Sequence, residues 1–193
     1  EGSFLAGYLA GLMTKTGKLG FVGGMEIDLI KKFLAGYAAG AKLANPSVQI
    51  LPAKYTGNWN DAGIAKEAAR ALFSQGADIV YHAAGRAGLG VIDAAKDAGK
   101  WAIGVDSDQD HIAQGRVLTS MVKRVDEAVF QTIKDLKEGN FSAETKTYDL
   151  AANGVGLSEM RFTKEQVGEE NLRKLEEVRA KIISGEIQVP DRM

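Results

Sequence analysis

Cysteine is missing from this chain of 193 residues, which excludes disulfide bonds, thiol catalysis and zinc sites built on cysteine. Histidine is scarce, and the spacing of His82 and His111 is not that of a metal site. The net charge of −1 leaves no excess of basic residues, so we expect no nucleic-acid or anionic-membrane surface. No apolar run is long enough to span a bilayer. The remaining composition, 45% hydrophobic and 25% charged, is that of an ordinary globular domain.

Short apolar runs that alternate with helical patterns fill the centre of the chain. The expected strands are residues 18–24, 48–55, 77–83, 101–106 and 116–122. The expected helices between and after them are residues 27–44, 61–74, 89–98 and 124–136. Regular alternation of strands and helices predicts right-handed βαβ units, and therefore an α/β fold with a parallel sheet flanked by helices.

The two ends of the chain depart from this alternation. Residues 1–13 have an amphipathic helical pattern with no strand before it. The pattern fits either a fragment or processed product of a longer protein, or a genuine N-terminal helix. Residues 145–160 predict two short extended pieces, and a capping box at Thr163 and Gln166 predicts a final helix over 167–184. This last segment is expected to pack on something other than the central sheet.

Three polar loops follow expected strands, namely TGNWND (56–61), HAAGRAGLG (82–90) and GVDSDQD (104–110). The carboxyl ends of parallel strands meet at one edge of a sheet, where open α/β sheets bind ligands. An indole, a glycine-lined turn and an acidic loop would then share one mouth. Asn58 or Asn60 is expected to cap the helix that follows the first loop. The grouping predicts a pocket for a small polar molecule with a flat part.

The side chains of these loops each have a functional and a structural interpretation. Trp59 lies in a polar context at the start of a helix, where it either stacks on a ligand or simply packs. Asp106 ends a strand, where it either accepts hydrogen bonds from vicinal hydroxyls or belongs to a solvated turn. Lys123 either points into the mouth and balances Asp106, or forms a surface pair with Arg124.

The glycines of the second loop do not match a nucleotide-binding motif. Gly85, Gly88 and Gly90 have the spacing G-x-x-G-x-G, the reverse of the dinucleotide fingerprint, and they follow the third strand rather than the first. Two interpretations stay open and are compatible. The glycines let a helix pack closely on the sheet, and they offer a backbone surface that a ligand can approach.

Metal binding and catalysis are not predicted. The aspartates that begin with Asp106 resemble the start of a calcium loop, but His111 and Val117 stand where an EF-hand needs Gly and Glu. Ser3 and Ser120 lack the setting of a nucleophilic serine. His82 is interpreted as a residue at the end of a strand whose ring is satisfied by hydrogen bonds. We therefore expect a binding protein with no cofactor rather than an enzyme.

Long stretches of the sequence resemble a known family. They are FVGGMEIDLIKKFLAGYAAGAKLANP, YTGNWNDAGIAKEAA, QGADIVYHAAGRAGLGVIDAAK, AIGVDSDQD and VLTSMVKRVDEAV. They closely resemble the basic membrane protein family, whose members are substrate-binding lipoproteins of ABC transporters similar to purine nucleoside receptors. The resemblance implies a type I periplasmic-binding-protein fold, in which two α/β lobes close on a ligand like a hinge.

The resemblance also implies roles for individual residues. Trp59 stands where an aromatic side chain stacks on a nucleobase, and Gly85 lines the pocket with its backbone. Asp106 accepts hydrogen bonds from ribose hydroxyls, and Lys123 completes this polar cluster. Arg86 stands where a small residue is expected, which puts the shape of that wall in doubt. The candidate ligand-binding residues are Trp59, Asn60, Gly85, Asp106, Lys123, Gly24 and Met25.

The resemblance implies that the first lobe of the family lies outside this sequence. The expected division is then an end of that lobe with a crossover (1–17), the second lobe (18–142) and a segment that normally returns to the first lobe (143–193). Only half of the cleft is then expected. The implied ligand is a purine nucleoside or a similar small polar molecule, and the implied partner is an ABC permease. The full-length protein is expected to be lipid-anchored at the periplasmic or extracellular face of the membrane.

Two further expectations follow from the resemblance. The terminal segments lack their usual sheet, so their exposed apolar stripes are expected to drive self-association or domain swapping. The same fold also serves as the effector domain of transcription factors, so a ligand-sensing regulatory domain is the alternative function.

Overall fold

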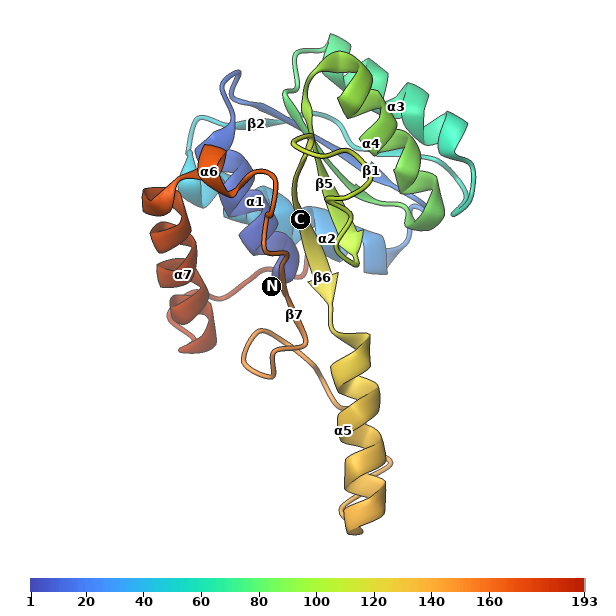
Figure 1. Ribbon diagram of the computed structural model, residues 1–193, viewed down its shortest axis with the longest axis vertical. Coiled ribbons are helices and arrows are strands. Elements are labelled where there is room, and N and C mark those ends of the chain that lie inside the picture. The colour runs from blue at the N-terminus through green and yellow to red at the C-terminus, as the bar shows by residue number, and fades with distance from the viewer. Residues whose placement is uncertain (193) are drawn as a thin grey trace.

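The computed structural model describes residues 1–192, and a single mixed sheet forms its centre (Figure 1). The strands are β1 (Lys18–Gly23), β2 (Gln49–Ile50), β3 (Lys54–Tyr55), β4 (Ile79–Ala83), β5 (Trp101–Asp106), β6 (Val117–Lys123) and β7 (Val155–Leu157). Their order is β2-β1-β4-β5-β6-β7, and β3 also pairs with β1. All pairs are parallel except β6 with β7. The predicted α/β fold with a parallel sheet is confirmed.

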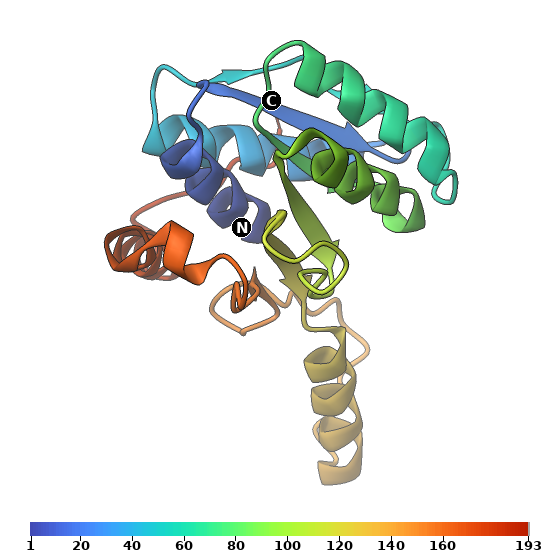
Figure 2. The same ribbon diagram turned by 45° about the horizontal axis from the view of Figure 1, so that its top comes forward.

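Helices cover both faces of this sheet (Figure 2). The helices of the described chain are α1 (Gly2–Met13), α2 (Asp28–Ala44), α3 (Ala62–Ser74), α4 (Leu89–Ala98), α5 (Val125–Glu138), α6 (Lys164–Val167) and α7 (Glu169–Ile183). Of these, α1 and α2 cover one face, and α3 and α4 cover the other. The alternation of side chains along a strand divides the core into two layers. Phe21 and Tyr81 face α1 and α2, whereas Val22 and Val80 face α3 and α4.

Helix α1 crosses α2 so closely that the contact has no room for side chains. A Cβ atom at Gly7 would lie 1.9 Å from the Tyr37 carbonyl oxygen, and one at Gly40 would lie 2.0 Å from the Phe4 oxygen. Residues 2–13 therefore belong to the same packed layer as α2. The expected division of the chain into 1–17, 18–142 and 143–193 stays a prediction.

The expected strand 48–55 is two short strands in the structure. Gln49 and Ile50 pair with the start of β1, and Lys54 and Tyr55 pair with its end. Pro52 stands between them, where it has no N–H to offer a ladder.

The C-terminal segment rejoins the sheet through β7, so the expectation that it packs elsewhere was wrong for this strand. Of the two extended pieces expected over 145–160, only β7 forms, and it adds to β6 as an antiparallel strand. Helix α7 then lies against α1, where Val178 and Ile182 pack with Phe4 and Leu5. The apolar stripes of the two terminal helices thus cover each other.

The predicted capping box does not form. The hydroxyl of Thr163 donates to the carbonyl oxygen of Leu118 at 2.7 Å instead of capping a helix. The expected helix over 167–184 corresponds to α7, which begins two residues later. Gly168, whose φ of +78° lies in the left-handed region, separates it from the short helix α6.

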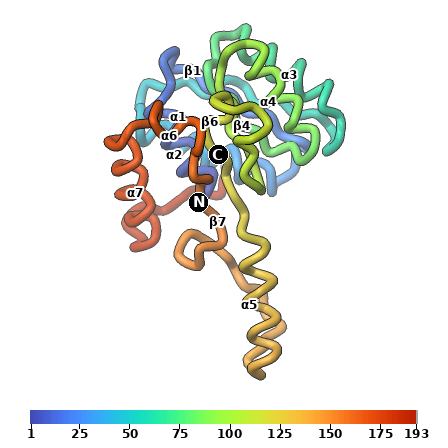
Figure 3. The backbone as a smooth tube through the Cα atoms, in the orientation of Figure 1, coloured from blue at the N-terminus to red at the C-terminus, as the bar shows by residue number. Residues whose placement is uncertain are grey.

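Helix α5 stands away from the rest of the molecule, and the chain returns alongside it (Figures 1 and 3). Every residue of α5 is half-buried or exposed. Its exposed apolar side chains, called the α5 stripe below, are Val125, Val129, Phe130, Ile133 and Leu136. Exposed apolar stripes were expected on the two terminal helices. The structure instead exposes an apolar stripe on α5. Among the described residues, no helix is both long and apolar enough to cross a bilayer.

Candidate ligand-binding site

The predicted loops meet at the carboxyl edge of the sheet. Gly24 follows β1 and its N–H donates to the Ala83 oxygen at the end of β4, at 3.0 Å. Asp106 ends β5, and Lys123 ends the neighbouring β6. Because these strands are parallel and adjacent, their last residues share one edge, called the mouth below.

Trp59 lies directly on the backbone of the first glycine turn. A Cβ atom added to Gly24 would lie 2.3 Å from both Cε3 and Cζ3 of the indole. A Cβ atom on Gly85, whose φ is +56°, would lie 3.6 Å from Cε3. Trp59 is nevertheless 37% exposed. The two glycines therefore support the ring and leave it surface with which to contact a ligand.

The loop that carries Trp59 is fixed at its backbone. The Trp59 carbonyl oxygen accepts a hydrogen bond of 2.8 Å from the Ala87 N–H, which belongs to the turn after β4. This bond ties the indole loop to the glycine turn of residues 85–88, a short 3₁₀ helix. Arg86 in that turn is exposed, whereas Ala87 and Gly88 are buried.

The cap of α3 differs from the expectation. Asp61 is the N-cap, and its carboxylate accepts a 3.1 Å hydrogen bond from the Ile64 N–H. Asn58 instead closes the preceding turn, because its side-chain oxygen accepts from the N–H groups of Asn60 and Asp61 at 2.9 and 2.7 Å. Asn60 itself is exposed at the rim. Asp61 was missed as the cap because either asparagine fits the sequence pattern equally well.

Asp106 and Lys123 form an ion pair with a separation of 2.9 Å between Oδ1 and Nζ. The two side chains are 54% and 39% exposed, so ligand hydroxyls can reach them. Lys123 Nζ also lies 4.9 Å from the centroid of the Phe33 ring, within range of a cation–π contact. Phe33 was missed as a mouth residue because its position fits the apolar stripe of α2.

His82 lies beneath the mouth and is fully buried. Its Nε2 lies 3.0 Å from Oε1 of Gln109, while Nδ1 has no hydrogen-bond partner among residues 1–192. Burial lowers the pKa of His82 to about 4, and the bond to Gln109 opposes that shift. The ring is therefore neutral near pH 7. The prediction that hydrogen bonds satisfy it holds for one nitrogen only.

The mouth is an open surface rather than a closed cavity. A hollow of about 750 Å³ lies between α2 and the C-terminal residues, lined by Asp28, Lys31 and Tyr55 among others, and it does not include Trp59, Asp106 or Lys123. Met25 lies half-buried at the turn after Gly24. Within the described residues, no group of three His, Asp or Glu side chains is arranged to hold a metal ion.

Sequence comparisons relate the chain to transport proteins. A family model described as ABC transporter substrate-binding protein, PnrA-like, matches residues 1–193. The CD4+ T-cell-stimulating antigen of Listeria monocytogenes is 39% identical over 209 residues, which cover 100% of the chain and 57% of that protein. Basic membrane protein A of Borreliella afzelii is 38% identical over 194 residues, which cover 98% of the chain and 58% of that protein. The chain thus spans somewhat more than half of each relative.

Solved structures show the same architecture. A solute-binding protein of an ABC transporter system from Aeropyrum pernix K1 superposes with a TM-score of 0.86 at 28% identity, over 98% of this chain and 64% of that chain. A transcriptional activator of the comK gene from Bacillus halodurans superposes with a TM-score of 0.84 at 27% identity, with the same coverage. The solute-binding-protein fold expected from the resemblance is confirmed.

Proposed function

The chain belongs to the family of PnrA-like substrate-binding proteins of ABC transporters, and from this premise we propose that its mouth binds a nucleoside, with purine nucleosides the first candidates. The observation that carries the proposal is the indole of Trp59, held on Gly24 at the same sheet edge as the Asp106–Lys123 pair. A flat aromatic surface suits a planar base, and a carboxylate suits two vicinal hydroxyls. The role is binding and delivery, with no reaction.

The mouth supplies one side of the proposed cleft. The relatives are longer than this chain, which covers 57% of one and 58% of the other. The α5 stripe offers an apolar surface on which the additional part of such a protein can pack, and that part would then provide the opposite wall. Because an open surface buries little of a ligand, we expect this chain alone to bind a nucleoside weakly.

Titration of this chain with guanosine and inosine tests the proposal. We expect millimolar nucleoside to quench Trp59 fluorescence and to shift the amide signals of Gly85 and Asp106, and we expect Trp59→Ala to abolish both effects. A mouth unchanged by nucleosides contradicts the assignment of the ligand. Isothermal titration tests the half-cleft interpretation. A dissociation constant below about 1 μM, equivalent to a binding free energy of about −8 kcal/mol, contradicts it.

The partner and the location belong to the same proposal. A substrate-binding protein delivers its ligand to a membrane permease, so an ABC permease is the proposed partner of the full-length protein. The proposed location is the periplasmic or extracellular face of the plasma membrane, with a lipid anchor outside the sequence given.

A regulatory domain is the second candidate function, because the comK activator superposes over 98% of the chain. The coding sequence upstream distinguishes the two. A signal peptide followed by a lipid-attachment cysteine supports transport, whereas a helix-turn-helix segment supports ligand-dependent regulation.

A further inference from the structure

The backbone of Asp106 is in a conformation that requires support from its surroundings. Its φ of +68° lies in the left-handed region, which is uncommon for residues other than glycine. Such conformations persist where neighbouring contacts hold them, and they are frequent at functional sites. The carboxylate that faces the mouth therefore depends on the loop that follows it.

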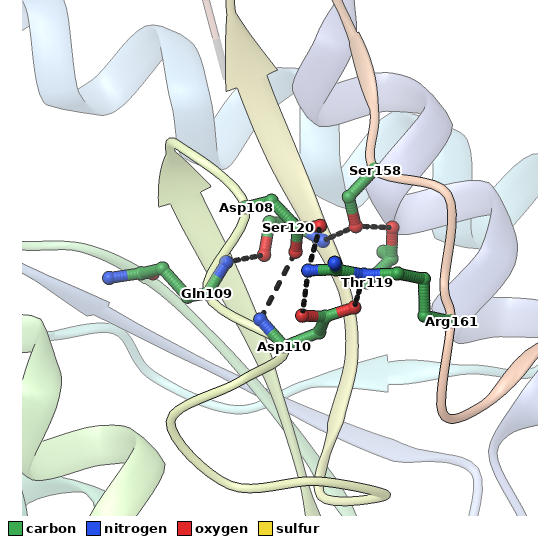
Figure 4. Close-up of polar contacts among 7 residues, drawn as sticks. All are labelled: Asp108, Gln109, Asp110, Thr119, Ser120, Ser158 and Arg161. Atoms are coloured by element: carbon green, nitrogen blue, oxygen red, sulfur yellow. Dashed lines mark hydrogen bonds and ion pairs between the residues drawn. The ribbon is translucent and has the colours of Figure 1, made fainter.

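Gln109 folds that loop back onto the strand. Its Oε1 accepts a 2.9 Å hydrogen bond from the Val105 N–H and lies 3.0 Å from His82 Nε2. Its own N–H donates to the hydroxyl oxygen of Ser120 at 3.0 Å (Figure 4). The hydrogen bond between Val105 and Gln109 thus closes the short loop that contains Asp106.

The next residues of the loop are clamped by an arginine from the C-terminal segment. Asp110 is 1% exposed, and its carboxylate accepts hydrogen bonds from Nε and Nη2 of Arg161 at 3.1 and 2.8 Å. Nη2 also lies 3.5 Å from Oδ2 of Asp108. A buried carboxylate without a cation is strongly unfavourable, so Arg161 holds the loop in place through Asp110.

Arg161 is itself anchored to the sheet. Ser158, three residues earlier, accepts a 2.9 Å hydrogen bond from the Ser120 N–H and lies 3.3 Å from the Thr119 hydroxyl (Figure 4). Thr163, two residues later, donates to the Leu118 carbonyl oxygen at 2.7 Å. The segment that carries Arg161 is therefore fixed to β6 on both sides.

We propose that Arg161 is a positioning residue for the ligand, acting through Asp110 and Gln109 to hold Asp106 where it receives ligand hydroxyls. The ligand part of this proposal rests on the proposed function. The coupling between Arg161 and the loop does not, and it is measurable without any ligand.

Amide hydrogen exchange of the ligand-free chain tests the coupling. In Arg161→Ala we expect the amides of Val105 and Gln109 to exchange at least about tenfold faster, because the loop that places Gln109 against Val105 and Ser120 is no longer held. The amide of Val80, in the centre of the sheet, should change little. Arg173→Ala is the matched control, because Arg173 is an exposed arginine that pairs with Glu177 on α7.

Two further variants separate positioning from general stabilisation. Arg161→Lys keeps the charge but cannot bind Asp110 with two parallel hydrogen bonds, so intermediate exchange is expected. Adding Asp110→Asn to Arg161→Ala removes the buried charge, so exchange at Val105 should return to within about threefold of the native rate. Unchanged exchange in Arg161→Ala overturns the proposal, as does equal acceleration at Val105 and Val80.

The ligand arm compares guanosine with 2′-deoxyguanosine by saturation-transfer NMR. We expect the native chain to prefer guanosine, and Arg161→Ala to lose that preference while still contacting the base through Trp59. A native preference that survives in Arg161→Ala overturns the link to the ligand. If the native chain contacts neither nucleoside, the proposed function fails, and the exchange experiment still decides the coupling.

Discussion

Replacing Gly24 by alanine tests whether Trp59 is a stacking surface that depends on its glycine support. The new Cβ would lie 2.3 Å from two atoms of the indole, whereas ordinary contact begins at 3.4 Å. The ring must therefore move by about 1.1 Å or tilt by an equivalent amount. The φ of Gly24 is not in the left-handed region, so the substitution strains the ring position rather than the backbone.

The expected effect on binding follows from the value of base stacking. Contact between a base and an aromatic side chain contributes about 1–3 kcal/mol, which corresponds to roughly 5- to 150-fold in affinity. Displacement of the indole removes part of this contact, so we expect Gly24→Ala to weaken guanosine binding by about tenfold. Trp59→Ala should weaken it at least as much, while Trp59→Phe should retain most of it.

Tryptophan fluorescence reports the displacement directly. The chain has two tryptophans, so a Trp101→Phe background leaves Trp59 as the sole reporter. In that background we expect Gly24→Ala to shift the emission maximum and to increase quenching by acrylamide. Gly156→Ala is the matched control, because a Cβ at that position meets no atom within 4 Å.

Two results would refute this reasoning. Unchanged emission and quenching in Gly24→Ala would mean that the indole does not rest on Gly24. Altered emission with unchanged affinity for guanosine would mean that Trp59 packs against the turn without stacking on the ligand.

Three further perturbations test other parts of the molecule. Burial lowers the pKa of His82 to about 4, whereas an unfolded histidine titrates near 6.5. Between these pH values the unfolded chain binds more protons than the folded chain. The free energy of unfolding should therefore fall by about 3 kcal/mol as the pH is lowered from about 6.5 to 4. In His82→Phe, denaturant titrations at several pH values should show a smaller loss, and an identical pH dependence would contradict the assignment. Asp106→Gly should change the free energy of unfolding by less than about 1 kcal/mol, because relief of the left-handed backbone offsets the flexibility of glycine. The same substitution should abolish the preference for guanosine over its 2′-deoxy form, because the carboxylate is lost. The α5 stripe should cause self-association of the chain at micromolar concentration. The double variant Phe130→Glu, Ile133→Glu should be monomeric in light scattering. Its thermal stability should be unchanged, since both side chains are 61% exposed. A native chain that is already monomeric would contradict this last prediction.

The fold class was predictable because its signal is local and repeated. Apolar runs bounded by glycine and proline alternate with helical patterns, and each such unit has few alternatives. The division of the strand around Pro52 was also visible in principle, because proline cannot donate to a ladder. The run over 48–55 nevertheless fits one continuous strand, because extended residues flank Pro52 on both sides.

The packing of the two ends was not predictable from local pattern. The path of the chain from β6 through α5 to β7 depends on an antiparallel pairing between residues more than 30 positions apart. An amphipathic stripe shows that a helix buries one side, but it does not identify the partner. The stripes on α1 and α7 were therefore recognised correctly as apolar surfaces, and their mutual contact became visible only in the structure.

The sequence likewise predicted some residues of the candidate site and not others. The residues at strand ends were identifiable, because strand order and direction bring them to one edge. Arg161 and Gln109 were not, because their importance arises from contacts with distant segments. No pattern near Arg161 indicates that it reaches Asp110, 51 positions away. The close fit of Trp59 on Gly24 likewise depends on distances that the sequence does not contain.

The path of the chain around α5 has a consequence for the mouth. The chain leaves the sheet after Lys123 and returns at β7, and the two crossing points are joined by the Arg124 N–H, which donates to the Gly154 oxygen at 2.8 Å. Two hydrogen-bonded strands, β6 and β7, therefore join the sheet to the arm formed by α5 and its return segment. Lys123 lies at the base of that arm and holds Asp106. The ion pair at the mouth therefore lies at the point where the arm joins the sheet.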